Sequence, residues 1–457
     1  MKETLDERKH SLIHFINTVM KKISIASFFA LLCLYTSAQT TVLNPMTDKN
    51  LLEDFQKRKL GLFVHWMACF SPKTGDSWGI GRGTSKEVAD SITLAWNPKK
   101  FSAKEIVDFA VKSGCKYMVV ISKHHDGFSI WDSKFTDFDL QAIKFKKDIL
   151  KELKTEAKKR GIMFGIYYSI ADLHYTGWEK MPELNNVPPE PNGGKEKMIE
   201  FVNNQVKELI TDYDPEILWF DGYWLDKYWT EEDGKNLYNF IKKTKPSILA
   251  TRTSLTIGAD GVETFKPDGS AGDFYSWEAK ERLNAPAFPW EGCTSVSYPV
   301  YAYDPGAKIQ SKKELINIFD KTICANGNFL LNIGPKRDGS LPKKLTSRFL
   351  ELSEWVLKNK DAVYNTTAGP FKQGDWGGST YKENKIFLHL RRQITPFEIN
   401  LPNGYKLLSV KEIVSGKPLA VKKSSNGYII NTPPINAAGG ATIIELRLDK
   451  NFVFNSS

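Results

Sequence analysis

The chain contains little cysteine and little histidine, with five Cys and seven His among 457 residues. After residue 38 the cysteines are Cys69, Cys115, Cys293 and Cys324, and no two of them form a CxxC pair. A structural zinc site is therefore not expected. A disulfide is an option in an exported protein, but the wide spacing of these residues favours buried free thiols.

The charge pattern lacks a basic block. There are 63 Lys and Arg against 53 Asp and Glu, a formal charge of +10, and the excess is spread along the chain. A nucleic-acid-binding surface usually concentrates its positive charge in one patch or stripe. We therefore interpret the excess as a solvated surface and expect no nucleic-acid partner.

A long apolar run is missing everywhere except near the N-terminus, in "MKKISIASFFALLCLYTSAQ", which starts at Met20. Two lysines precede the run, and Ser37 and Ala38 follow it. This pattern is typical of a secretory signal peptide over residues 1–38, with Met20 as an alternative start. The run is shorter than the roughly 20 residues of a membrane span. We expect a bacterial-type protein exported to the periplasm or the extracellular space, without stable membrane insertion.

Short, continuously apolar runs are present, and they alternate with amphipathic stretches of helical length. The runs cover residues 61–66, 116–123, 161–169, 216–222, 247–254 and 328–335. Continuous apolarity is typical of strands that are buried on both faces of a parallel sheet. The pairs Ser102/Glu105 and Ser311/Glu314 have the spacing of helix-capping boxes.

Repeated strand–helix units over about 300 residues predict a (β/α)8 barrel. A doubly wound sheet is the alternative, but no glycine-rich phosphate motif follows any of the runs. After residue 365, short strands separated by turn residues predict a small β-sandwich. The expected organisation is a catalytic barrel over residues 47–362 and an accessory β-sandwich over residues 363–457, with no cofactor.

Polar and aromatic residues follow five successive predicted strands. The carboxyl ends of barrel strands face the active site, so we expect these side chains to converge on one pocket. A single such residue is more often a satisfied core group, whereas the whole set indicates a binding site. The set comprises His65, Trp66, His124, His125, Tyr167, Tyr168, Trp219, Asp221 and Arg252.

Asp221 is the most informative member of this set. It closes the apolar run "ILWF" and precedes Gly222. A buried carboxylate is costly unless it is paired or used in chemistry. The alternative interpretation is a loop cap, in which Asp221 accepts hydrogen bonds from the amides that follow it.

Several motifs resemble those of the α-L-fucosidases of glycoside hydrolase family 29. They are "GLFVHW", "KHHDGFSIWDSKFTDFD", "FGIYYS", "LWFDG", "GDFYSWE" and "GNFLLNIGPKRDG", and the resemblance covers residues 55–360. It implies a barrel followed by a β-sandwich, in agreement with the pattern of runs. It also implies a retaining exo-glycosidase that removes terminal α-L-fucosyl residues from oligosaccharides or glycoconjugates.

The resemblance assigns the catalytic roles to carboxylates. It implies that Asp221 is the nucleophile and forms a covalent fucosyl-enzyme. It implies Glu278 as the acid/base, with Glu291 as the rival because "WEGC" is also similar to a family motif. The two carboxyl groups of a retaining enzyme should lie about 5–5.5 Å apart.

By the same resemblance, His65, His124 and His125 bind the sugar hydroxyls, since imidazoles both donate and accept hydrogen bonds. Trp78 stands where the family has a tryptophan whose acidic neighbour is missing here, so a related L-galacto or 6-deoxy sugar stays an alternative substrate. The pocket is completed by Trp66, Tyr167 or Tyr168, Trp219 and Arg252.

Two other functions stay open at this point. A catalytically inactive barrel could serve as a sugar-binding module, and three histidines with Asp221 could serve a metal-dependent hydrolase. Against a metal, His124 and His125 are adjacent on a segment expected to be extended, so their side chains should point in opposite directions. No metal is therefore expected, and the sequence leaves the oligomeric state open.

Overall fold

The computed structural model describes residues 43–68, 84–175, 193–225, 228–254, 256–257, 263–264, 272–278, 286, 288–425, 427–435 and 439–453. The expected signal peptide, Cys69 and Trp78 lie outside the described residues. Over the described ranges, no helix combines the length and the apolarity needed to cross a membrane.

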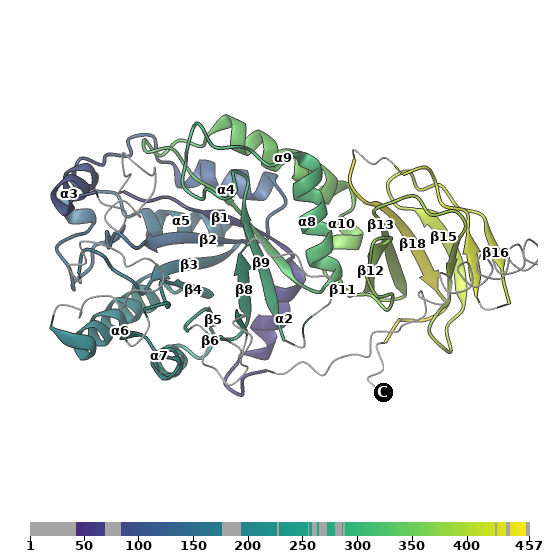
Figure 1. Cartoon of the computed structure of the whole chain (residues 1–457), viewed down its shortest axis with the longest axis horizontal. Helices are drawn as coiled ribbons and strands as arrows, with labels where there is room; N and C mark the ends of the chain where they lie inside the picture. Colours follow the sequence, from purple (N-terminus) through teal and green to yellow (C-terminus); the bar gives the residue numbers. More distant parts are fainter. Residues whose placement is uncertain are drawn as a thin grey trace, which may run out of the picture.

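Eight parallel strands in the described part of the chain form a nearly closed barrel (Figure 1), in the order β5-β4-β3-β2-β1-β10-β9-β8. A parallel bridge between Thr251 and Phe274 joins the two ends of this order, and Thr251 Oγ1 donates a hydrogen bond of 2.7 Å to Phe274 O. The predicted barrel is therefore confirmed. The strands are β1 Leu60–Val64, β2 Tyr117–Lys123, β3 Met163–Ser169, β4 Ile217–Asp221, β5 Leu249–Thr251, β8 Tyr275–Glu278, β9 Trp290–Ser295 and β10 Asn328–Ile333.

Helices surround the barrel, and two of them, α4 and α8, start at the capping residues that the sequence indicated. Ser311 and Glu314 form the expected capping box, with Glu314 Oε2 accepting from Ser311 N at 2.7 Å. Ser102 Oγ accepts from Glu105 N at 3.2 Å. The helices are α2 Lys49–Arg58, α3 Lys86–Leu94, α4 Ala103–Lys112, α5 Ile149–Lys159, α6 Gly194–Tyr213, α7 Glu231–Thr244, α8 Lys312–Cys324, α9 Lys343–Lys358 and α10 Lys360–Val363, with a 3₁₀ turn η3 at Leu140–Ala142.

Apolar side chains fill the barrel interior at the end where the strands begin. Phe55 of α2 packs edge-on against Tyr117 of β2, with ring centroids 5.1 Å apart. Above them Phe63 and Trp219 pack together inside the ring, with centroids 5.4 Å apart. Because this end is closed by α2, an opening into the barrel is left at the carboxyl ends of the strands.

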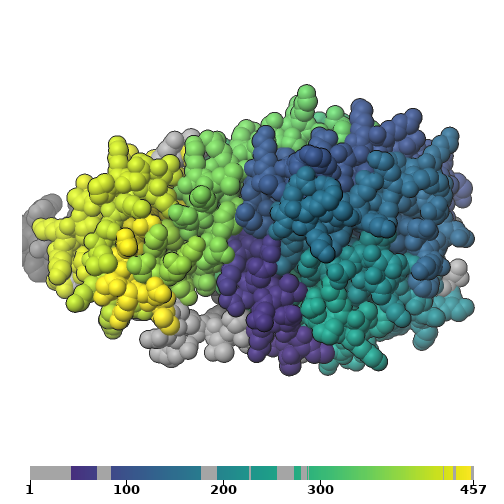
Figure 2. Space-filling model, turned by 180° about the vertical axis from the view of Figure 1, so that it is seen from behind, coloured from purple at the N-terminus to yellow at the C-terminus, as the bar shows by residue number. Residues whose placement is uncertain are grey.

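The C-terminal part is a separate antiparallel β structure, as predicted. Two sheets, β11-β12-β13-β18-β15 and β14-β17-β16, share one apolar core. In the view of Figure 2 these strands, in yellow-green and yellow, form one end of the molecule, and α2, in purple, lies at the surface beside them. The strands are β11 Thr367–Ala368, β12 Gly377–Lys382, β13 Lys385–Leu390, β14 Phe397–Ile399, β15 Leu407–Glu412, β16 Val421–Lys423, β17 Tyr428–Ile430 and β18 Thr442–Leu448, and the barrel carries a hairpin of β6 Thr256–Ile257 and β7 Glu263–Thr264.

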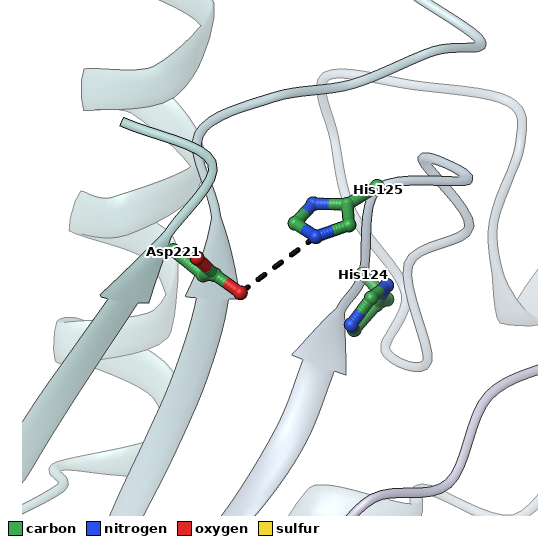
Figure 3. A group of neighbouring side chains, drawn as sticks. All are labelled: His124, His125 and Asp221. Carbon is green, nitrogen blue, oxygen red and sulfur yellow. Dashed lines mark ion pairs between the residues drawn. The ribbon is translucent and has the colours of Figure 1, made fainter. Parts of the chain in front are cut away.

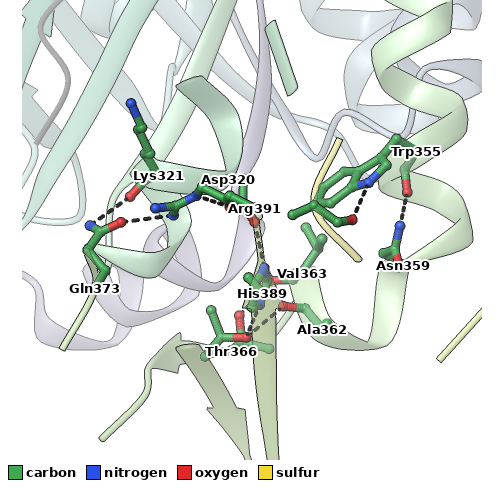
Figure 4. Close-up of polar contacts among 12 residues, drawn as sticks. Asp320, Lys321, Trp355, Asn359, Ala362, Val363, Thr366, Gln373, His389 and Arg391 are labelled. Atoms are coloured by element: carbon green, nitrogen blue, oxygen red, sulfur yellow. Dashed lines mark hydrogen bonds and ion pairs between the residues drawn. The ribbon is translucent and has the colours of Figure 1, made fainter. Parts of the chain in front are cut away.

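A buried polar network joins the sandwich to helix α8 (Figure 4). Asp320 Oδ1 lies 2.6 Å from His389 Nδ1, and Asp320 Oδ2 accepts from Arg391 Nε at 2.7 Å. Arg391 in turn donates to Gln373 Oε1 at 2.9 Å, and His389 Nε2 lies 2.9 Å from Thr380 Oγ1. Further hydrogen bonds, such as Trp355 Nε1 to Ala441 O at 3.1 Å, add to the directional contacts of this interface.

We expect Asp320→Ala to lower the free energy of unfolding by about 3–5 kcal/mol, because it leaves the buried guanidinium of Arg391 without its carboxylate. Burial opposes ionisation of Asp320, but its interactions with Arg391 and His389 outweigh burial and lower the pKa of Asp320. Chemical denaturation measures the effect. Asp137→Ala, at an exposed loop position, is the control and should cost less than about 0.5 kcal/mol. Equal losses in the two variants would contradict this role.

Candidate active site

A cavity of about 370 Å³ opens at the carboxyl ends of the barrel strands. Most of the sequence-predicted site residues line it, together with a loop that follows β9. The lining residues are Phe63, His65, Met67, His124, His125, Tyr167, Trp219, Asp221, Glu278, Pro299, Val300, Tyr301 and Ala302.

Asp221 ends β4, and its carboxylate is held by three donors. Tyr167 OH donates to Oδ2 at 2.9 Å, Gly222 N donates to Oδ1 at 2.9 Å, and Arg252 Nη2 approaches Oδ1 at 3.4 Å. The side chain is 14% exposed, so one part of it faces the cavity. The hydrogen bond from Gly222 N matches the loop-cap alternative, but the other two donors and the cavity exceed what a cap requires. Asp221 is thus a fixed carboxylate at an open site.

Glu278 ends β8 and shares Arg252 with Asp221. Arg252 Nη1 donates to Glu278 Oε1 at 2.7 Å, and Nη2 donates to Tyr223 OH at 2.9 Å. The guanidinium lies over the ring of Trp219, 4.4 Å from its centroid. Arg252 adopts φ = 60°, a left-handed conformation that is strained for a non-glycine residue and concentrates at functional sites. One cation therefore connects the carboxylates that end β4 and β8.

Glu291 is fully buried beneath this cavity and does not line it. Its carboxyl group accepts from Tyr117 OH at 2.6 Å, Ser276 Oγ at 2.8 Å and Trp219 Nε1 at 3.1 Å. Burial raises the pKa of Glu291 to about 7, although the three hydrogen bonds act in the opposite direction. Since Trp219 lines the cavity, the hydrogen bond to Glu291 fixes the position of one lining side chain.

We expect the stability difference between the wild type and Glu291→Gln to decrease as the pH rises from about 4.5 to about 7. In this interval the folded wild type keeps a proton that the unfolded chain has released, so its stability falls with rising pH. Glutamine does not titrate, so the stability of the variant lacks this pH dependence. The raised pKa of Glu291 corresponds to a change of about 3 kcal/mol in the free energy of unfolding of the wild type. Chemical denaturation of both proteins at several pH values measures it. Parallel pH curves would contradict a raised pKa.

His124 and His125 lie beside Asp221 (Figure 3), and both line the cavity together with His65. Strand β2 ends at Lys123, and the chain turns at once, with Gly127 N donating to His124 O at 3.0 Å. Both adjacent imidazoles consequently line the cavity, with ring centroids 4.1 Å apart, and His65 lies 4.8 Å from His124. The expectation that His124 and His125 point in opposite directions is wrong, because it assumed an extended segment.

All three imidazoles are neutral at neutral pH. Burial lowers the pKa of His125 to about 3 and the pKa values of His65 and His124 well below 6.5, and a neighbouring imidazole lowers each of them further. A neutral imidazole offers one donor and one acceptor. This part of the wall can therefore form hydrogen bonds with uncharged hydroxyl groups.

Contrary to the expectation from the sequence, ring nitrogens of His124 and His125 and a carboxylate oxygen of Asp221 lie within 4.8 Å of one another, close enough to share a metal ion. A metal-free site stays a prediction. It rests on the chemistry that two carboxylates can perform without a metal.

Two of the expected site residues face away from the cavity. Tyr168 follows Tyr167 on β3, and because successive side chains of a strand alternate, its hydroxyl contacts Lys123 at 3.0 Å and Gln205 at 2.8 Å in the outer layer. Trp66 packs in the same outer core and donates from Nε1 to Lys336 O at 3.0 Å. Of the two tyrosines, Tyr167 is the one that reaches the cavity.

The family model for α-L-fucosidase matches residues 35–361. The chain belongs to the α-L-fucosidase family. Human plasma α-L-fucosidase is 24% identical over 418 residues, covering 83% of this chain and 85% of its own length. Rat tissue α-L-fucosidase is 27% identical over 370 residues, covering 74% of this chain and 77% of its own.

Solved α-L-fucosidase structures have the same fold as this family member. One is a family 29 enzyme of Bacteroides thetaiotaomicron, described as a trapped covalent intermediate with 2-fluoro-fucosyl fluoride. It has a TM-score of 0.77 and 22% identity, and covers 91% of this chain and 99% of its own. Isoenzyme 1 of Paenibacillus thiaminolyticus has a TM-score of 0.75 and 24% identity, and covers 88% of this chain and 99% of its own.

Sequence reasoning missed several residues of this α-L-fucosidase family site. Tyr301 lies on the loop after β9, with its ring 5.4 Å from that of His65, and Tyr223 contacts Arg252. The tyrosine-rich stretch "SYPVYAY" was the available signal for Tyr301. The buried Cys115, Cys293 and Cys324 are free thiols, as expected from their spacing.

Proposed function

We propose that this chain is a retaining exo-α-L-fucosidase that removes terminal α-L-fucosyl residues from glycans through a covalent intermediate on Asp221. The observation that carries the proposal is the pair Asp221 and Glu278 on one cavity, both in contact with Arg252. Membership of the α-L-fucosidase family supports the substrate class.

In the first step, an Asp221 oxygen attacks the anomeric carbon. The bond between that carbon and the aglycone oxygen breaks, and the departing oxygen takes the proton of Glu278. The donors Tyr167, Gly222 and Arg252 hold the Asp221 carboxylate so that one oxygen faces the cavity. In the second step, Glu278 removes a proton from water, the water oxygen attacks the same carbon, and Asp221 is released with net retention.

Exposure favours Glu278 over Glu291 as the acid/base. The Glu278 side chain is 42% exposed, so it can exchange protons with solvent and reach an aglycone oxygen. Glu291 is fully buried and its oxygens are occupied by Tyr117, Ser276 and Trp219. A group that must give and retake a proton in every turnover needs access to the reacting atoms.

His65, His124 and His125 bind the sugar hydroxyls in this proposal, since they are neutral and line the cavity. Tyr167 and Trp219 supply apolar faces for the C–H edges of the sugar. Trp66 and Tyr168 are left out of the proposed pocket because their hydrogen bonds lie in the outer layer.

The proposal is tested with p-nitrophenyl α-L-fucoside by following the first-formed sugar with NMR. We expect the α anomer of L-fucose to appear first, with no loss of rate after EDTA treatment. First release of the β anomer would overturn retention, and binding without turnover would favour a sugar-binding module. Loss of activity to EDTA would favour a metal-dependent hydrolase. Faster turnover of another 6-deoxy or L-galacto substrate would change the substrate class.

We further propose that the protein is exported after cleavage near Ala38. The support is the lysine pair, apolar run and Ser37-Ala38 sequence. N-terminal sequencing of the mature protein is expected to begin at Gln39, and an uncleaved N-terminus would contradict this.

A further inference from the structure

Ser169 is a fully buried residue next to His125 and Asp221, which line the cavity. It ends β3 and pairs in register with Asp221 of β4. It does not line the cavity. Its hydroxyl lies 2.7 Å from His125 Nδ1 and 2.6 Å from the carbonyl oxygen of Ala171. A serine thus connects a backbone carbonyl to an imidazole of the sugar-binding wall.

These two contacts determine where the protons lie. A hydroxyl has one proton to donate, and a carbonyl oxygen can only accept. The Ser169 proton is therefore on the side of Ala171, and Ser169 Oγ presents a lone pair to His125. It follows that His125 Nδ1 carries a hydrogen and donates it to Ser169. In a neutral imidazole the other nitrogen, Nε2, is then an acceptor only.

The acceptor Nε2 of His125 faces the proposed nucleophile. It lies 3.6 Å from Asp221 Oδ2 (Figure 3). Because both atoms are acceptors, neither satisfies the other, and a donor placed between them can bond to both. Next to the nucleophile of a glycosidase, the nearest donor on the substrate is the hydroxyl on the carbon adjacent to the anomeric carbon.

We propose that Ser169 is a positioning residue that holds His125 in the Nδ1–H tautomer, so that Nε2 accepts the hydrogen bond of the sugar 2-hydroxyl. This inference rests on the proposed fucosidase function and names the group that reads one hydroxyl of its substrate. In glycoside hydrolysis, a hydrogen bond to the 2-hydroxyl strengthens in the transition state and so lowers the activation free energy.

The packing around Ser169 keeps this arrangement rigid. Gly222 lies against it, and a Cβ added there would be 2.8 Å from Ser169 Oγ and 2.5 Å from Ala171 N. Gly222 also has φ = 70°, which glycine tolerates best. Leu173 N donates to His125 O at 2.8 Å and fixes the backbone of His125. The serine hydroxyl consequently has one orientation that satisfies both of its contacts.

The first experiment compares wild type and Ser169→Ala on p-nitrophenyl α-L-fucoside and on its 2-deoxy analogue. Without the serine, His125 can adopt the other tautomer and donate from Nε2 to Asp221, so the 2-hydroxyl loses its acceptor. We expect kcat/KM for the fucoside to fall about tenfold or more, the range of one lost hydrogen bond. The 2-deoxy analogue should lose less than twofold, because it has no hydroxyl to misplace. Equal losses on both substrates, or none on either, would overturn the proposal.

The second experiment reads the tautomer directly and does not depend on turnover. We expect ¹⁵N NMR of histidine-labelled wild type at neutral pH to show His125 protonated at Nδ1, with the signal assigned by its loss in His125→Gln. Ser169→Ala should shift the population toward Nε2–H, and Ser169→Thr, which keeps the hydroxyl, should restore Nδ1–H. A wild-type His125 protonated at Nε2 overturns the inference even in an active fucosidase. The inferred tautomer in a protein without fucosidase activity overturns the proposed function instead.

Discussion

Asp221→Ala is expected to lower kcat/KM for p-nitrophenyl α-L-fucoside by at least about 10⁴-fold, in the range found when an enzyme loses its nucleophile. The variant keeps Glu278 and the histidines, but no atom can bond to the anomeric carbon from the face opposite the aglycone. L-fucose should still bind, since the imidazoles of His65, His124 and His125 are unchanged in the cavity, and calorimetry measures that binding. Asp137→Ala, at an exposed position, is the control and should keep full activity.

Added azide tests whether Asp221 acts as a nucleophile rather than as a structural anion. Azide can enter the space left by the carboxylate and attack the anomeric carbon directly. The expected product of Asp221→Ala with an activated fucoside is β-L-fucosyl azide, in which the configuration is inverted. Recovery of the α azide, or activity within tenfold of the wild type without azide, would remove Asp221 from this role.

Glu278→Ala is expected to lower kcat/KM about 10²- to 10⁴-fold on natural fucosides, the contribution of a general acid/base. The loss should be much smaller on a 2,4-dinitrophenyl fucoside, because that leaving group departs without a proton. Its covalent intermediate then accumulates, since Glu278 is missing as the base for water. Azide needs no base, so it should restore turnover and yield α-L-fucosyl azide with retained configuration.

Glu291→Ala serves as the matched comparison for this assignment. It removes a carboxylate from the barrel interior rather than from the cavity. We expect it to lower stability and to disturb Trp219 without any rescue by azide. If azide rescues Glu291→Ala and has no effect on Glu278→Ala, the acid/base assignment is reversed.

The sequence predicted most of the barrel because burial on both faces leaves a continuous apolar run. Strands β1 to β5 and β10 correspond to such runs, as in Tyr117–Lys123 and Asn328–Ile333. Strands β8 and β9 did not stand out, since Tyr275–Glu278 is short and Trp290–Ser295 contains Glu, Gly, Thr and Ser. Glu278 lines the cavity and Ser276 bonds to Glu291, and such polar residues dilute the apolar signal.

The candidate site was predicted from strand ends, and the residues whose side chains face into the ring do line the cavity, while their roles stay predictions. Trp66 does not line the cavity, and the choice between Tyr167 and Tyr168 was left open, because a sequence does not say which of two adjacent residues points inward. The directions of His124 and His125 were predicted wrongly, because the chain turns directly after Lys123 instead of staying extended through His125. Ser169 gave no signal at all, since its role depends on a hydrogen bond across two strands.

The retaining mechanism is tested most directly by trapping the covalent intermediate. With 2-deoxy-2-fluoro-L-fucosyl fluoride, the fluorine at C2 slows both steps, while the good leaving group lets the first proceed without a strong acid. We expect intact-mass spectrometry to show one added 2-fluorofucosyl group on the protein, and peptide mapping to place it on Asp221. A label on another carboxylate, or fluoride release with no adduct in the wild type or in Glu278→Gln, would contradict the account.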